Sequence, residues 1–124
     1  MASYRVNNYL KHAVQNFYCI IRDLGTDKIG IERFPGKVEY YPTEFLIPIE
    51  LSSDHLSLAG FIQHENYFMK SYKNKNLIIA YNTEGKLILR DVDGISIRLN
   101  YVHDLQNFYF DTTGEELQIN LIGI

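Results

Sequence analysis

The residues best suited to chemistry lie around one predicted turn in the second half of the chain, where aromatic rings alternate with ammonium groups. They are Tyr67, Lys70, Tyr72, Lys73 and Lys75. Aromatic rings stack on nucleobases, and ammonium groups neutralise phosphates. The pattern therefore favours a site for an anionic ligand that contains a base. A second interpretation stays open, because Lys-Asn-Lys-Asn at 73–76 is also an ordinary solvated turn that protects a sheet edge.

Three more residues extend this candidate ligand site. Arg90 and Arg98 fall on neighbouring predicted strands, where their guanidinium groups can converge on one anion. His103 lies in the first turn of a predicted helix, on the side opposite Leu105, and is either a solvated residue or a contact for a ligand or partner. The predicted ligand-binding set is Tyr67, Lys70, Tyr72, Lys73, Arg90, Arg98 and His103.

No constellation typical of an active site stands in the sequence. It contains no Gly-rich phosphate loop, no nucleophile elbow, no HExxH pair and no Cys or His pair at metal-binding spacing. Glu115 and Glu116 are adjacent, but neighbours in an extended segment point to opposite faces and cannot act as a carboxylate pair. Cys19 has apolar neighbours and no cation to activate its thiol, so we expect a buried structural residue. We predict a protein that is not an enzyme, with no catalytic residues, no metal ligands and no cofactor.

The elements that must position these residues are short strands with frequent turns, which are typical of a mostly antiparallel sheet. In the N-terminal half we predict strands at 3–6, 16–23, 28–33 and 37–41. The segments 25–27 and 34–36 reverse the chain between them. Four short strands within forty residues predict a small SH3-like barrel or a curled sheet.

A crossing segment and a short helix follow. Pro42 and Pro48 bracket residues 43–49, which we expect to form an edge or a crossing, because proline cannot donate to a central ladder. Ser52 or Ser53 then caps a short helix, which ends near residue 60.

The sequence of the second half predicts a four-stranded meander and a C-terminal helix. The strands are at 67–72, 77–82, 86–91 and 95–99. Asn100 caps a helix over 101–112, which Gly114 ends and which covers the sheet face that carries Ile97 and Leu99. A last strand at 116–121 has Leu117, Ile119 and Leu121 pointing inward. The fold class is therefore α+β and mostly antiparallel β.

Size and composition limit the organisation of the chain. For a chain of 124 residues with 46% hydrophobic residues we predict one domain, 1–124. An alternative stays open, in which 1–50 and 51–124 form two lobes that share a core. The net charge of −3 argues against generic nucleic-acid binding, which needs an excess of Lys and Arg. The single cysteine and the lack of an apolar run of about 18 residues predict a cytoplasmic protein without a disulfide or a membrane span.

Tyr101–Leu117 resembles the motif YVHQLQNLYFALTGEEL, and Tyr4–Leu10 is similar to RIGNYV. These motifs are the ending and the start of a group of small proteins of unknown function from Bacteroidetes phages and prophages, which this chain therefore resembles. Residues 45–51 and 58–61 are similar to their middle, PIPLTEEWLLKFGF. The sequence departs from the group at Asn7, where the group has glycine. The resemblance implies a viral or mobile-element origin and a location in the cytoplasm of the bacterial host, and it supplies no catalytic residues.

Two classes of function follow. In a phage protein, the first is a non-catalytic binder that sequesters a small anionic, nucleotide-like ligand such as a host defence signal, through Tyr stacking and Lys or Arg pairing. The second is a regulatory or structural module that binds a host protein through an apolar or aromatic surface. A concave site lined by Tyr and by two or more Lys or Arg would favour the ligand binder, whereas a flat aromatic surface would favour the protein-interaction module. Self-association as a homo-oligomer stays open.

Overall fold

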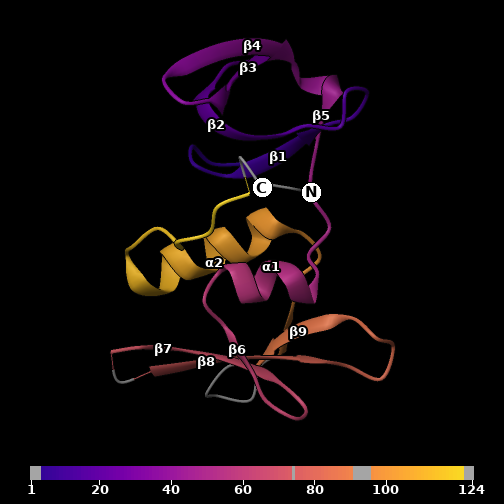
Figure 1. The fold of residues 1–124 in the computed structure, drawn as a ribbon, viewed down its shortest axis with the longest axis vertical. Helices are drawn as coiled ribbons and strands as arrows, with labels where there is room; N and C mark the ends of the chain where they lie inside the picture. Colours follow the sequence, from indigo (N-terminus) through magenta and orange to yellow (C-terminus); the bar gives the residue numbers. More distant parts are fainter. Residues whose placement is uncertain (1–3, 74, 91–95, 122–124) are drawn as a thin grey trace.

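The chain folds into three layers, with two antiparallel sheets at opposite ends and two α-helices between them (Figure 1). The computed structural model describes residues 4–73, 75–90 and 96–121. Within these ranges each sheet has five strands. The predicted fold class, α+β with mostly antiparallel β-structure, is confirmed.

The N-terminal sheet is a meander of four strands with a fifth strand added at one edge. Its strands are β1 (Tyr9–His12), β2 (Tyr18–Leu24), β3 (Lys28–Phe34), β4 (Lys37–Pro42) and β5 (Leu46–Ile47), in the order β4-β3-β2-β1-β5. A 3₁₀-helix, η1 (Thr43–Phe45), carries the chain from β4 to β5. The edge strands β4 and β5 do not pair with each other in the described part of the chain, so the sheet is curled and not closed.

Both faces of the curled sheet bury apolar residues. The enclosed face holds a small core of its own, made of Leu10, Cys19, Ile21, Ile29, Ile31 and Leu46. Since strand residues alternate between faces, Tyr9, Tyr18 and Ile20 point the other way and pack against the larger core of the molecule.

The strand predicted at 3–6 is wrong over residues 4–6, and residue 3 lies outside the described residues. The chain turns here instead, because the Asn8 side chain accepts a hydrogen bond from the Arg5 N–H at 2.8 Å and Asn7 adopts a left-handed φ of 79°. Asparagine tolerates this conformation better than most residues. The first strand therefore begins at Tyr9.

The second sheet contains the predicted four-stranded meander. Its strands are β6 (Ile62–Gln63), β7 (Phe68–Tyr72), β8 (Lys75–Tyr81), β9 (Leu87–Arg90) and β10 (Ser96–Arg98), in the order β10-β9-β8-β7-β6. The short β6 extends the meander by one strand. Residues 91 and 95, at the ends of two predicted strands, lie outside the described residues.

The two helices agree with the sequence prediction to within a residue or two. α1 (Ser53–Leu58) follows Ser52, whose N–H donates to His55 Nδ1 at 3.1 Å. α2 (Val102–Thr113) ends at Gly114, which has a φ of 76°. Its N-cap is Tyr101 rather than Asn100, because Asp104 Oδ2 accepts the N–H groups of both residues, at 3.0 and 3.2 Å.

The larger core lies between the helices and the second sheet and continues up to β1. The α2 residues Val102, Leu105 and Tyr109 are buried in it. No helix among the described residues is long and apolar enough to cross a membrane.

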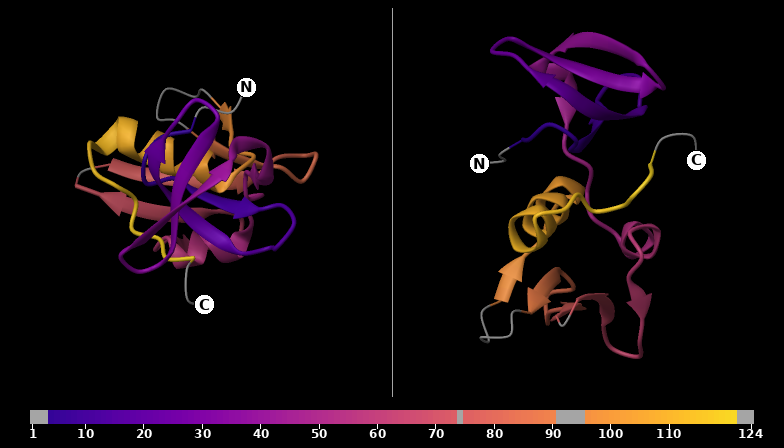
Figure 2. Two further views of the ribbon diagram at one scale, coloured as in Figure 1. Left: turned by 90° about the horizontal axis from the view of Figure 1, so that it is seen from above. Right: turned by 90° about the vertical axis from the view of Figure 1, so that its left-hand side faces the viewer.

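The strand predicted at 116–121 is wrong, although the inward direction of Leu117, Ile119 and Leu121 is confirmed. The segment rises from the end of α2 toward the N-terminal sheet without forming a ladder (Figure 2). Its three apolar side chains are buried in the larger core.

Candidate ligand-binding site

Two hollows share, as lining residues, the two members of an isolated antiparallel bridge between Glu50 and Tyr101. Val102 N–H donates to the Ile49 carbonyl at 2.8 Å, and Leu51 N–H donates to the Asn100 carbonyl at 3.0 Å. Because these bonds are made by the neighbours of Glu50 and Tyr101, the two residues themselves form a non-hydrogen-bonded pair. In such a pair the two Cα atoms are about 4.5 Å apart and both side chains project to the same face. The bridge therefore places a carboxylate beside a phenol ring, and both residues line both hollows.

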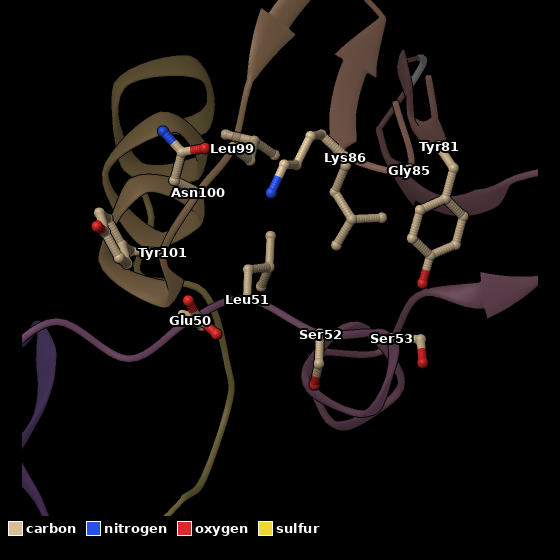
Figure 3. A pocket seen from close by; sticks show the side chains of 11 residues that line it. Glu50, Leu51, Ser52, Ser53, Tyr81, Gly85, Lys86, Leu99, Asn100 and Tyr101 are labelled. Atoms are coloured by element: carbon tan, nitrogen blue, oxygen red, sulfur yellow. The ribbon is translucent and has the colours of Figure 1, made fainter. Parts of the chain in front are cut away.

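The first hollow, here called the Lys86 hollow, has a volume of about 450 Å³. Its lining combines apolar residues with hydroxyl, amide and charged groups: Glu50, Leu51, Ser52, Ser53, Tyr81, Gly85, Lys86, Leu87, Leu99, Asn100 and Tyr101. Figure 3 shows the Lys86 ammonium directed into the space between Leu51 and Leu99, with the Tyr81 ring at the far side. The hollow therefore offers a cation, several hydroxyl groups and an aromatic ring to one bound molecule.

The turn between β8 and β9 fixes Lys86 at the rim of this hollow. Asn82 Oδ1 accepts the backbone N–H groups of Glu84 and Lys86, each at 2.9 Å, and Gly85 has a φ of 77°. Within the described part of the chain, no carboxylate pairs with the Lys86 ammonium. This ammonium is thus held near the cavity with its charge available.

The second hollow, here called the Lys11 hollow, has a volume of about 480 Å³. It is lined by Lys11, Tyr18, Ile47, Pro48, Ile49, Glu50, His55 and Tyr101. His55 Nδ1 accepts the Ser52 N–H, and burial lowers the pKa of this histidine although Asp54 opposes the shift. Neutral His55 therefore stabilises the start of α1 and adds no positive charge to the hollow.

Two residues of the sequence-predicted set, Lys70 and Tyr72, make internal contacts at the C-terminal ends of the helices. Lys70 Nζ donates to the Ala59 carbonyl at 2.9 Å, just after α1. The Tyr72 hydroxyl donates to the Thr113 carbonyl of α2 at 3.2 Å, and its ring packs edge-on against Tyr109. Both side chains satisfy helix carbonyl groups that have no partner within the helix.

Tyr67 and Lys73 lie at opposite ends of β7. The Tyr67 ring stacks on His64, with 4.7 Å between the ring centroids. Lys73 occupies the hairpin turn with a φ of 52°, and its ammonium lies 5.4 Å from the centre of the Tyr72 ring. Of the predicted aromatic and basic cluster, Lys73 thus lies against Tyr72, and Lys75 is directly opposite Tyr72 in the β7–β8 register.

Arg90 and Arg98 lie on the face of the second sheet that points away from the helices. In the β9–β10 register Arg90 pairs with Ser96 and Arg98 with Ile88, so both guanidinium groups share this face. Arg98 forms an exposed ion pair with Glu84 at 3.1 Å. Neither arginine lines either hollow.

His103 is buried, with 1% of its surface exposed, rather than solvated on the helix surface. Its ring stacks on Tyr101, with centroids 5.6 Å apart, and meets Tyr4 edge-on at 5.0 Å. Neither ring nitrogen has a hydrogen-bond partner among the described residues; the Asp104 carboxylate lies 3.5 Å from Nε2. His103 therefore supports Tyr101 from behind and does not line the two hollows.

The sequence reasoning missed Lys11, Glu50, Lys86 and Tyr101. Only Lys86 carried a local signal, because it follows a predicted hairpin turn at 83–85. Glu50 and Tyr101 are brought together by the bridge between two segments that are far apart in the sequence, and Lys11 is placed near them by the β1–β5 pairing, in which it is opposite Ile47. No protein-family model matches the chain, and no curated protein or solved structure matches it either.

Proposed function

We propose that this protein binds a small anionic, nucleotide-like ligand without transforming it, and that the Lys86 hollow is the site. The observation that carries the proposal is the Lys86 ammonium, which has no carboxylate partner in the described ranges and points into a cavity with hydroxyl groups and tyrosine rings. An ammonium beside a partly enclosed cavity attracts a phosphate, and Tyr81 offers a face for a base. The volume of about 450 Å³ lies in the range of small-molecule sites.

This proposal moves the site away from the hairpin turn at 73–76. Lys70 and Tyr72 already satisfy backbone carbonyl groups, so a ligand there would have to replace internal hydrogen bonds. Among the described residues, no backbone carbonyl accepts a hydrogen bond from the Lys86 ammonium. We expect the cost of binding to be lower at the Lys86 hollow for this reason.

The biological setting follows from the phage resemblance of Tyr4–Leu10 and Tyr101–Leu117. We infer a protein of the bacterial host cytoplasm that sequesters a defence signal. We also infer that the N-terminal sheet is of the SH3-like type, since its four-stranded meander and the 3₁₀-helix before β5 suit a small curled barrel.

A protein-interaction module is the second candidate function. The observation in its favour is a group of exposed apolar side chains on β3 and β4, among them Phe34, Val38 and Tyr40, which are 44% to 56% exposed. Because β4 is an edge strand, a partner has both apolar surface and free backbone groups to bind there.

Calorimetric titration with mononucleotides, cyclic oligonucleotides and nucleotide sugars tests the first proposal. We expect the affinity for the ligand to fall as the salt concentration rises. We also expect Lys86→Ala to lower this affinity by about tenfold. Lys75→Ala is the matched control, since Lys75 is an exposed lysine of the β7–β8 hairpin. Loss of binding in Lys75→Ala with none in Lys86→Ala would return the site to the hairpin. Absence of binding to every nucleotide, together with co-purification of a host protein, would favour the second candidate.

A further inference from the structure

We propose that the ligand carries two separate anionic groups and spans both hollows across the bridge between Glu50 and Tyr101, as a dinucleotide does. This inference rests on the proposed function and goes further, since it names the class of ligand. It follows from two observations. Each hollow has a lysine and a tyrosine of its own, and the carboxylate of Glu50 lies between the two hollows.

The two hollows are neighbours that share a wall. Glu50 and Tyr101 line both of them, and their side chains project side by side from the two bridged segments. The hollows have similar volumes, about 450 and 480 Å³, and each lies within the range of a small-molecule site. One molecule of two similar halves therefore has room on both sides of the bridge.

Each hollow contains one lysine and one tyrosine of its own. Lys86 and Tyr81 line the first, and Lys11 and Tyr18 line the second. Lys11 on β1 is directly opposite Tyr18 on β2, so both side chains point to the same face of the sheet. The ammonium of Lys11, like that of Lys86, has no carboxylate partner in the part of the chain that the structure describes. The pair of cavities thus offers two cations and two aromatic faces, which match two phosphates and two bases.

The carboxylate of Glu50 limits which chemical groups the ligand can carry between its two anionic groups. This carboxylate has no ion-pair partner in the described ranges and stands where the hollows meet. A continuous chain of phosphates would place negative charge against it. Amino or hydroxyl donors on a base or sugar would instead form charge-assisted hydrogen bonds with it. Glu50 therefore selects against a nucleoside triphosphate and favours two phosphates separated by donor groups.

Titration calorimetry with cyclic di-GMP and cyclic di-AMP, each compared with its 5′-mononucleotide, tests the inference. We expect a dinucleotide to bind at least about 100-fold more tightly than its mononucleotide, because the second half binds intramolecularly. Lys11→Ala and Lys86→Ala should each weaken dinucleotide binding, whereas Lys37→Ala on the outer strand β4 should not. Equal thermal unfolding curves of the variants would show that the fold is intact.

The outcomes separate this inference from the proposed function. Equal affinity for mononucleotide and dinucleotide, or an effect of Lys86→Ala without an effect of Lys11→Ala, would overturn the two-hollow ligand and leave the Lys86 site standing. Absence of binding to all four nucleotides and to the nucleotide sugars of the wider panel would overturn both. GTP supplies a further measurement: we expect Glu50→Gln to raise its affinity, and an unchanged or lower GTP affinity in Glu50→Gln would contradict the role of Glu50.

Discussion

Gln106 and Tyr9 are joined by a hydrogen bond between residues that stand 97 positions apart in the chain. The Tyr9 N–H donates to Gln106 Oε1 at 2.9 Å, and Gln106 Nε2 donates to the Asn7 carbonyl at 2.9 Å. The side-chain amide thereby pairs with the backbone on either side of Asn8, as a neighbouring strand would. It connects α2 to the start of the N-terminal sheet.

Other residues on the same face of α2 strengthen this connection. Asn107 Oδ1 accepts hydrogen bonds from Asn8 Nδ2 at 2.8 Å and from Arg5 Nε at 3.1 Å. Arg5 also pairs with Glu116 and lies 4.3 Å from the centre of the Phe110 ring. α2 is therefore buried on two faces, one apolar against the second sheet and one largely polar against residues 5–9.

We predict that Gln106→Leu destabilises the protein by about 1 to 3 kcal/mol for each backbone group left without its partner. Gln106 is 2% exposed, so water cannot replace the lost bonds without rearrangement of the contact. Urea unfolding followed by circular dichroism measures the change. Gln118→Leu, at an exposed position, is the matched control and should leave the free energy of unfolding nearly unchanged. Equal midpoints for the two variants would contradict the structural role of Gln106.

The buried imidazole of His103 predicts loss of stability in mild acid. Burial lowers the pKa of His103 from its ordinary 6.5, although Asp104 opposes the shift. In the unfolded chain the group takes up a proton as the pH falls through about 6.5, while the folded state resists protonation. The unfolded state then binds more protons, so the free energy of unfolding is highest above pH 6.5 and falls as the pH drops toward the folded pKa.

His103→Phe tests this pH dependence. Phenylalanine keeps a ring between Tyr4 and Tyr101 but has no group to protonate. We expect a flatter profile of thermal stability between pH 7 and about 5 than in the wild type, with a remaining slope from His55, whose pKa burial also lowers. Parallel profiles for the wild type and His103→Phe would show that this histidine is not responsible.

Cys19 is predicted to be unreactive while the protein is folded. Its side chain is fully buried in the curled N-terminal sheet, where burial raises the pKa of the thiol to about 12. Iodoacetamide at pH 8 should leave the folded protein unlabelled and should alkylate the same cysteine once urea unfolds the chain. Intact-mass spectrometry measures both states. Rapid labelling without urea would show that the sheet opens readily around β2.

The sequence by itself determined the elements that depend on near neighbours. The end of α2 follows from Gly114, which adopts the left-handed conformation that ends helices. The alternation of Leu117, Ile119 and Leu121 set their inward direction even though no ladder forms there. Turn residues and alternating apolar residues likewise placed most strands to within a few positions, because a turn or a strand face is decided by a handful of consecutive side chains.

Only the tertiary structure decided which residues surround the two hollows and which faces of α2 are buried. The sequence predicts a solvated position or a surface contact for His103, because a helix that covers one sheet has a free opposite face. Nothing in the sequence shows that residues 4–9 cover this face, with Tyr4 meeting the His103 ring. Lys70 and Tyr72 looked available because nothing local showed that the carbonyls of Ala59 and Thr113 would be within their reach. Glu50 and Tyr101 meet through backbone hydrogen bonds, which leave no mark on side-chain type. Contacts between distant segments depend on how the sheets and helices pack as a whole, and that packing is not encoded in any short window of sequence.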